Sequence, residues 1–380
     1  MTFVPQTASE CVPPALVKAK AIDWSAFLNR PLFDSACIHD TAVADKTVLV
    51  TGAGGSIGST LAERLMGGLA SHLLLLDSSE QNLLALYRKY QERHVTLPKT
   101  EFFHADIRDE KLLQDVISSY QPQIVFHAAA MKYVPQLEHH PFIALENNVM
   151  GTLRLLEDLD HCPLECFVNV STDKAVNPSS ILGASKRITE LLLLAMQPEN
   201  PRCRSLRLGN VLGSAGSVVP LFLQSLKAQR PLQMTLPPAS RYFLTMDEAA
   251  AYLMKSLELP ETSLLLPEMG SPLKIMDLAR FLLGEFWDSS RTDLLDFIPL
   301  RDGEKQNEQL VYSYEHLEAT SIAQLYKIRG SETSDPEVFI SKMGNLLELV
   351  RARSTNGLAD ALTAIVPEYI PSPTFLRHAA

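Results

Sequence analysis

Short apolar runs alternate with longer segments of helical periodicity through the first part of the chain. Residues Thr47–Thr51 (TVLVT) form a β-branched run that stops at glycines, as a buried parallel strand does. The segment 57–66 follows with Ile57, Leu61 and Leu65 on one helical face. The same pattern predicts further strands and helices, with strands at 73–76, 101–105, 123–127, 165–170 and 204–208 and helices at 81–93, 110–120, 141–160 and 184–196.

Strand–helix alternation at this pace predicts βαβ units and therefore an α/β fold with a doubly wound parallel sheet of the Rossmann type. After Leu208 the alternation is lost and Gly and Pro become more frequent, so we expect a smaller, discontinuous C-terminal lobe. The expected division is an N-terminal extension, a main domain that a helix at 246–259 rejoins, and the lobe, with bounds 1–45, 46–208 plus 241–266, and 209–240 plus 267–380. The extension is expected to be partly helical over 15–29.

Composition narrows the class of protein. Hydrophobic residues make up 46% and charged residues 21% of the 380 residues, which is typical of a globular protein with a large core. Lys and Arg number 34 against 44 Asp and Glu, and this balance argues against a nucleic-acid or membrane-surface binder. A local site can still bind an anionic small ligand.

The N-terminal sequence, the lengths of the apolar stretches and the cysteines lead to expectations about location and metal binding. The N-terminus lacks a basic start followed by an apolar run, and apolar stretches such as 73–76 and 191–196 are too short to span a bilayer, which predicts a soluble, cytoplasmic protein. The five cysteines are scattered, and the pair Cys162 and Cys166 has no second Cys or His pair to complete a metal site. We therefore expect free thiols and no metal.

A glycine-rich motif, TGAGGSIG, connects the first strand to the first helix. Gly52, Gly55 and Gly58 give the GxxGxxG spacing of a turn without side chains, so that backbone N–H groups and the helix N-terminus can reach a pyrophosphate. Ser56 and Ile57 begin the helix and are expected to contact the same ligand. The strand before the motif, the helix after it and an acid downstream are the context of a dinucleotide site.

The acid is Asp77, which ends the second strand. There it can accept hydrogen bonds from the adenosine ribose, and its charge would repel a 2′-phosphate. Since Ser78, Ser79 and Glu80 follow instead of an Arg, NAD is favoured over NADP, and the main domain is predicted to bind NAD. A helix N-cap is the alternative role of Asp77. Asp106 and Ile107 follow the third strand and are expected to flank the adenine.

A second polar cluster follows the fifth strand. Ser171, Thr172, Asp173 and Lys174 leave the carboxyl end of that strand, where ligands bind in open α/β sheets, and Lys186 follows in the next helix. A hydroxyl, a carboxyl and an amine are therefore expected to converge near the nicotinamide. The alternative is a helix cap with solvated charges.

Several motifs together resemble one family, the CapD-like polysaccharide-biosynthesis branch of the extended short-chain dehydrogenases/reductases, typified by UDP-N-acetylglucosamine 4,6-dehydratases. The similarity covers about residues 27–320, in the motifs TGAGGSIGS, HAAAMKYVP (127–135), NNVMGT (147–152), STDKAVNPSSILGASKR (171–187), RLGNVLGSAGSVVPLF (207–222) and RDGEK (301–305).

The resemblance implies a role for particular residues. Asp173 and Lys174 correspond to the dehydratase acid and base, and Thr172 and Lys186 to members of the hydroxyl/Lys catalytic set. The cofactor set further includes Ala128, Ala129 and Lys186. The substrate, implied to be a UDP-linked sugar, would contact Lys132, Asn148, Asn210, Val218, Arg241, Arg301 and Glu304. Both arginines suit a diphosphate, which guanidinium groups bind bidentately, although a surface ion pair is the alternative for each. A homo-oligomer is also implied.

One departure concerns the YxxxK signature of the wider superfamily. Its Tyr would stand at Leu182, so the phenolate that accepts the sugar hydroxyl proton is missing. Asp173, or a water held by Thr172, would have to accept that proton. The segment before Arg241, TLPPASRYF, also differs from that of the family.

The resulting hypothesis is a 4,6-dehydratase. NAD⁺ takes hydride from C4, a neutral Lys174 removes the C5 proton, a protonated Asp173 donates to the leaving C6 oxygen, and hydride returns to C6. These roles require a lowered pKa for Lys174 and a raised pKa for Asp173. The alternatives are a nucleotide-sugar epimerase with the same cofactor and a non-catalytic NAD-binding regulatory protein.

Overall fold

A nine-stranded sheet forms the centre of the molecule. The structure is a computed structural model that describes residues 22–33, 40–93, 98–195, 202–236, 238–286, 294–331 and 335–379. Seven neighbouring strands are parallel, in the order β11-β6-β5-β4-β1-β2-β3, and β15 and β14 continue the sheet antiparallel beyond β11. Their bounds are β1 Thr47–Thr51, β2 His72–Asp77, β3 Lys99–His104, β4 Ile124–His127, β5 Cys166–Thr172, β6 Arg202–Leu208, β11 Ser263–Pro267, β14 His316–Ala319 and β15 Leu325–Arg329.

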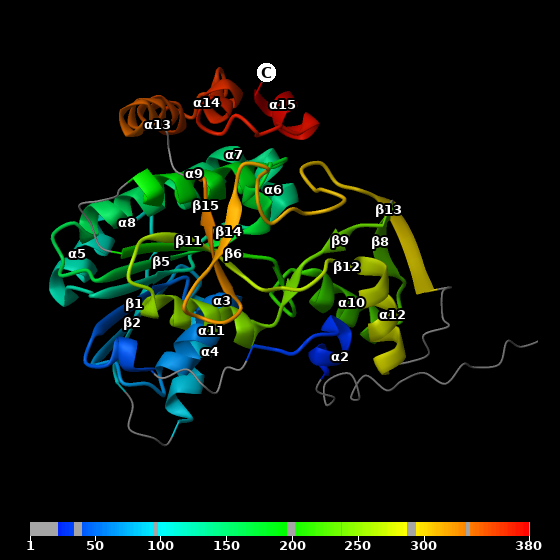
Figure 1. The fold of residues 1–380 in the computed structure, drawn as a ribbon, viewed down its shortest axis with the longest axis horizontal. Helices are drawn as coiled ribbons and strands as arrows, with labels where there is room; N and C mark the ends of the chain where they lie inside the picture. The colour runs from blue at the N-terminus through cyan, green and yellow to red at the C-terminus, as the bar shows by residue number, and fades with distance from the viewer. Residues whose placement is uncertain are drawn as a thin grey trace, which may run out of the picture.

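Helices cover both faces of this sheet, which confirms the predicted α/β, doubly wound fold (Figure 1). One face carries α3 (Ser56–Leu65), α4 (Glu80–Gln91) and α11 (Met246–Lys255). The other carries the helices α5 (Glu110–Tyr120), α6 (Val134–His139), α7 (Pro141–Ala144), α8 (Gly151–Leu159) and α9 (Ile181–Ala195). The central strands β1 and β4 are buried on both faces, which explains their continuous apolar runs.

The helix predicted over 141–160 is interrupted. Between α7 and α8 lies a π-helical turn, η3 (Leu145–Met150), in which the N–H of Gly151 donates to the carbonyl of Glu146 instead of the residue four positions back. The hydroxyl of Thr152 donates to the carbonyl of Asn148 at 2.6 Å. Periodicity alone does not reveal this extra residue in the turn.

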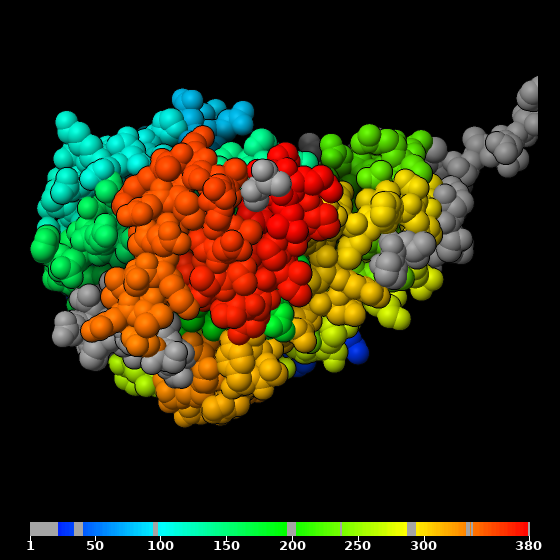
Figure 2. Space-filling view, turned by 90° about the horizontal axis from the view of Figure 1, so that it is seen from above, coloured from blue at the N-terminus to red at the C-terminus, as the bar shows by residue number. Residues whose placement is uncertain are grey.

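The C-terminal part of the chain belongs to the main sheet and its helical layer. Residues 316–329, expected in the smaller lobe, form the β14–β15 hairpin on β11. The helices α13 (Pro336–Arg351), α14 (Leu358–Ile365) and α15 (Pro373–Ala379) follow and cover one side of the molecule in Figure 2. Their apolar side chains Phe339, Leu346 and Phe375 join the core cluster of α5, α8 and α9. The strands and helices from residue 316 onward therefore pack with the main domain, although the frequency of Gly and Pro predicted that they belong to the smaller lobe.

The smaller lobe has its own core, on the right in Figure 1. It contains α10 (Val218–Lys227), α12 (Ile275–Phe286) and three strand pairs, β8–β13 (Leu232–Leu236 and Leu295–Pro299), β9–β12 (Ser240–Arg241 and Leu273–Lys274) and β7–β10 (Asn210–Val211 and Phe243–Leu244). From the N-terminal extension, α2 (Trp24–Leu28) packs there, with Phe27 against Phe243 and Phe281. The expected helix at 15–29 begins outside the described residues.

Short 3₁₀ turns complete the described chain, η2 (Asp40–Val43), η4 (Asp173–Ala175) and η5 (Ser256–Glu258). In the part of the chain that the structure describes, Cys162 and Cys203 are free thiols, the sulfur of Cys166 accepts a hydrogen bond from Arg204, and no group of side chains could hold a metal ion. Cys11 and Cys37 lie outside it. No helix within the described ranges combines the length and apolarity needed to span a bilayer.

Candidate active site

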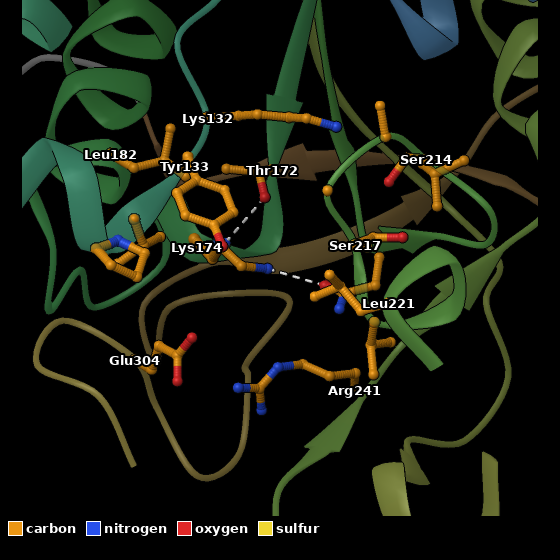
Figure 3. A pocket seen from close by; sticks show the side chains of 18 of the residues that line it. Lys132, Tyr133, Thr172, Lys174, Leu182, Ser214, Ser217, Leu221, Arg241 and Glu304 are labelled. Carbon is orange, nitrogen blue, oxygen red and sulfur yellow. Dashed lines mark hydrogen bonds between the residues drawn. The ribbon is translucent and has the colours of Figure 1, made fainter. Parts of the chain in front are cut away.

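A cavity of about 830 Å³ lies between the carboxyl ends of the sheet strands and the smaller lobe. Its lining runs from the glycine motif past the end of β5 to α10 and the segment 301–308. Figure 3 shows part of it, with Thr172 and Lys174 from the end of β5 and Glu304 from the segment 301–308. Fifteen residues expected in the site line it, and they are Gly52, Gly55, Ser56, Ile57, Gly58, Ala128, Lys132, Thr172, Lys174, Lys186, Asn210, Val218, Arg241, Arg301 and Glu304.

The glycine motif forms a tight cradle at one end of the cavity. Gly52 has a φ of 67°, and a Cβ there would lie 2.6 Å from the backbone nitrogen of Ala129, so only glycine fits. Helix α3 begins at Ser56 and directs its N-terminus into the same space. An anion placed here would meet free N–H groups and the positive helix end.

Asp77 supports the cradle from behind. Its carboxylate accepts hydrogen bonds from the backbone N–H of Gly54 and of Ser79, both at 2.8 Å. The N-cap of α4 is Ser79, so the N-cap alternative for Asp77 does not hold. Asp77 is buried and is outside the cavity lining.

Four further expected residues do not line the cavity. Asp106 pairs with Arg108 at 2.7 Å, and Ile107 is buried against Gly151. Ala129 lies under Gly52. Asn148, expected to bind substrate, is buried in η3, where its amide bonds to both backbone groups of Met131 and to the hydroxyl of Ser185. Asn148 therefore fixes the β4–α6 segment to α9.

Thr172, Asp173 and Lys174 form a hydrogen-bonded chain at the end of β5. Thr172 Oγ1 donates to Asp173 Oδ1 at 3.0 Å, and Lys174 Nζ donates to the same oxygen at 2.9 Å. Lys174 Nζ also donates to Asn210 Oδ1 at 2.9 Å, and both residues line the cavity. Asp173 is fully buried and does not line the cavity, although Thr172 and Lys174 do.

Burial and neighbouring charges shift the pKa values of Asp173 and Lys174. Burial raises the pKa of Asp173, as its expected role requires. Burial lowers the pKa of Lys174, but the carboxylates of Asp173 and Glu308 outweigh this and raise it above its usual value. The expected lowered pKa of Lys174 is therefore wrong, because the sequence does not show that two carboxylates share this amine.

Lys186 is buried one turn into α9 and lines the cavity. Its Nζ donates to the carbonyl of Val170 at 2.8 Å. Burial lowers its pKa to about 8, against the opposing charge of Glu190. Leu182 lines the same wall, so an apolar side chain stands where the superfamily has Tyr.

The two arginines differ in what they contact. Arg241 is buried, and its Nη atoms donate to the carbonyls of Ser240, Lys305 and Gln306. It therefore anchors the segment 305–306, which leaves few donors for a phosphate. Arg301 lines the cavity and is exposed, and its guanidinium has no hydrogen bond or ion pair within the described ranges.

Glu308, Lys305 and Tyr133 are among the cavity residues that the sequence analysis does not assign to the site. Glu308 reaches Lys174 from a distant loop and pairs with Lys305, and the signal in the sequence is the RDGEK motif, which ends at Lys305. Tyr133 also lines the cavity (Figure 3), and its signal is its place in the HAAAMKYVP motif.

Comparisons with known proteins show the family of this chain. Residues 48–330 match the family described as "Polysaccharide biosynthesis protein". The probable polysaccharide biosynthesis protein EpsC of Bacillus subtilis is 36% identical over 274 residues, which cover 71% of this chain and 45% of EpsC. The capsular polysaccharide biosynthesis protein CapD of Staphylococcus aureus is 34% identical over 77% of this chain and 49% of its own. The chain thus spans about half the length of these relatives.

Two further similarities concern proteins with named activities. A UDP-glucose 4-epimerase of Rickettsia bellii is 31% identical over 75% of this chain and 83% of its own. The solved structure of DesIV, a dTDP-glucose 4,6-dehydratase from Streptomyces venezuelae with NAD and DAU bound, superposes with a TM-score of 0.61 at 23% identity, over 70% of this chain and 88% of DesIV.

The fold is a doubly wound α/β sheet with a smaller lobe, and solved structures that superpose on it include a dTDP-glucose 4,6-dehydratase and a UDP-glucose 4-epimerase. The chain belongs to the polysaccharide biosynthesis protein family, as the match over most of its length shows.

Proposed function

We propose that this protein is an NAD-dependent nucleotide-sugar 4,6-dehydratase that converts a UDP-linked hexose, such as UDP-N-acetylglucosamine, into its 4-keto-6-deoxy product. The observation that carries the proposal is the hydrogen-bonded chain Thr172–Asp173–Lys174 at the cavity wall. A carboxyl and an amine beside a dinucleotide cradle are the acid and base that removal of water requires.

The residues present fit NAD. The cradle at Gly52 leaves no room for side chains, and the start of α3 faces the cavity, as a pyrophosphate requires. Lys186 would hold the nicotinamide ribose at the other end. The cofactor would supply a reversible hydride acceptor for C4 of the sugar. A diphosphate would bind Arg301, whose guanidinium is free to do so.

The first proton transfer replaces the missing tyrosine. When C4 is oxidised, its hydroxyl proton passes to Thr172 Oγ1, whose own proton passes to Asp173 Oδ1 at 3.0 Å. Asp173 does not line the cavity, so it is reached through its two neighbours. The transfer leaves Asp173 protonated, as its later role as an acid requires.

The second transfer uses the same pair. Protonation of Asp173 removes one of the two charges that raise the pKa of Lys174, so burial then favours the neutral amine, and Lys174 releases its proton to solvent. The neutral Lys174 takes the C5 proton, which the C4 ketone has made acidic. Through Thr172, the proton of Asp173 leaves with the C6 hydroxyl as water. When the hydride taken from C4 is returned to C6, Lys174 gives the proton back to C5.

Substitution tests these roles. Asp173→Asn and Lys174→Ala should each reduce dehydration by about a hundredfold or more, because each removes a proton-transfer group. The readout is the mass of the product of a UDP-sugar panel, with NAD and UDP binding measured beside it. Asp115→Asn and Lys111→Ala, on the exposed side of α5, are the controls. Turnover retained in either site variant would reject the assignment.

Epimerisation is the second candidate, favoured by the similarity to UDP-glucose 4-epimerase. In heavy water a dehydratase product is lighter by one water and carries deuterium at C5. A C4 epimerase leaves the mass unchanged, and a C5 epimerase adds deuterium without loss of water. Cofactor binding with no change in any sugar would instead indicate a regulatory protein.

A further inference from the structure

Glu308 brings a second carboxylate to the proposed acid–base pair. It lies on the segment that follows the RDGEK motif, lines the cavity and has a side chain that is only 2% exposed. Its Oε1 is 3.8 Å from Lys174 Nζ and 3.9 Å from Arg241 Nε, and its Oε2 is 3.2 Å from Lys305 Nζ. Glu308 is thus surrounded by three cations.

This arrangement gives the cluster a defined balance of charge. Two carboxylates, Asp173 and Glu308, face Lys174, Lys305 and Arg241 in a buried space. A buried carboxylate costs free energy unless it is paired. Arg241 and Lys305 are also fixed by backbone carbonyls, Arg241 by three of them and Lys305 by that of Val176. Lys174 is the cation of the three that forms ion pairs with both carboxylates.

The two carboxylates differ in what they can do. Asp173 accepts hydrogen bonds from the hydroxyl of Thr172 and the amine of Lys174. Because a hydroxyl can pass a proton on, that environment suits a group that gains and loses a proton. Glu308 lies within 4 Å of three cations, Lys174, Arg241 and Lys305, which suits a group that stays ionised.

We propose that Glu308 is a positioning residue of this site, the fixed counter-ion that holds the Lys174 amine between two carboxylates and lets Asp173 alone carry the exchanging proton. The effect on catalysis rests on the proposed function, whereas the effect of Glu308 on the position and pKa of the Lys174 amine does not. The shifts agree with it. Burial would raise the pKa of Glu308, yet Lys174, Lys305 and Arg241 together lower it, whereas the pKa of Asp173 is raised.

The test that needs no substrate is the titration of Lys174. Trace acetylation with acetic anhydride over a pH series, read by peptide mass spectrometry, measures the pKa of this amine. Loss of the Glu308 charge in Glu308→Gln should lower that pKa, so that acetylation of Lys174 begins at lower pH. Glu308→Asp keeps the charge and should give a profile closer to that of the unchanged protein.

Activity provides the second readout. Because Glu308 raises the pKa of Asp173, which must be ionised to accept the C4 hydroxyl proton, Glu308→Gln should move the acidic limb of the kcat profile to lower pH. We expect kcat to fall by about tenfold, with the KM of the nucleotide sugar nearly unchanged and Glu308→Asp restoring part of the loss. Glu318→Gln, on exposed β14, is the matched control.

The outcomes are separable. An acetylation profile of Lys174 that is the same in Glu308→Gln, Glu308→Asp and the unchanged protein overturns the proposal, whatever the activity. If Glu308→Gln does not fold, the profile of Glu308→Asp decides. Its shorter side chain moves the carboxylate away from Lys174, so the acetylation profile should still shift to lower pH, by less than in Glu308→Gln. A shifted profile in a protein that dehydrates no sugar would support the counter-ion role and reject the proposed function.

Discussion

Lys186 keeps an ammonium group where burial disfavours one. Its Nζ reaches the carbonyl of Val170, and its pKa is lowered to about 8. The ammonium is therefore present at neutral pH and is lost as the pH rises through about 8. Any contact that needs this charge, such as one to the cofactor ribose, becomes weaker on the alkaline side.

This predicts an alkaline limb in the activity profile that belongs to Lys186. Activity should fall as the pH passes about 8. Lys186→Met should be impaired at every pH because it has no charge to lose. In Lys186→Arg the side chain stays protonated, so whatever activity remains should lack the limb. Measurement of kcat/KM against pH in the three proteins checks this, and an unchanged limb in Lys186→Arg would contradict it.

The sequence predicts some of the residues that make up the site but not all of them. Thr172, Asp173 and Lys174 are consecutive, so the end of one strand brings them together, and a glycine motif next to a strand predicts the cradle at Gly52. Glu308 reaches Lys174 only through the path of a long loop, which no local pattern encodes. The burial of Asp173 and the orientation of Asn148 toward Met131 also depend on packing that the sequence does not display.

At the scale of elements, the site depends on how α9 packs against the turn η4. These two elements are in close contact, and Gly183 on α9 faces the carbonyl of Lys174. A Cβ at Gly183 would lie 2.3 Å from that carbonyl oxygen, so the two backbones can approach this closely only without a side chain.

We therefore predict that Gly183→Ala displaces η4 and lowers activity more than it lowers NAD affinity. The backbone clash must push Lys174 and Asp173 away from their present positions, whereas the cradle at Gly52 lies elsewhere. Gly344→Ala is the control, because a Cβ at this helical position meets nothing within 4 Å and should leave activity unchanged. Equal losses of activity and NAD affinity in Gly183→Ala would argue against a local effect.

Elements with strong periodicity are the predictable ones. The strands β1 and β4 and the helix α5 lie where apolar runs and i, i+3, i+4 spacing place them. The hairpin β14–β15 is not predicted, since β14 has only four residues, all exposed, and HLEA is too short for its alternation to distinguish a strand. It forms because β11 offers an unpaired edge, which is a property of the assembled sheet.

At the scale of the whole molecule, the C-terminal helices are part of the main core. Phe375 on α15 is fully buried beside Tyr369, and Ser372 and Thr374, just before it, donate hydrogen bonds to Glu138 and Asp302. The helices are thereby fixed to α6 and to the loop that carries Arg301, next to the cavity.

This predicts a clear difference between two neighbouring positions. Phe375→Ala should reduce the free energy of unfolding by about 3–5 kcal/mol, as for other large-to-small changes in a core. Leu376, 47% exposed on the same helix, should cost no more than about 0.5 kcal/mol when changed to Ala. Chemical denaturation of both variants measures this, and similar stabilities would show that α15 is not integral to the core.

The β14–β15 hairpin has one more consequence. Strand β11 is buried along its whole length, and without the hairpin its outer backbone groups would be open to pairing with a strand of another molecule. β15 occupies those groups, and the new outermost strand, β14, has only four residues, with Glu318 paired to Arg329 of β15. The sheet thus ends in a short strand that offers an incoming chain few backbone groups for pairing, which is one way in which proteins limit edge-to-edge aggregation.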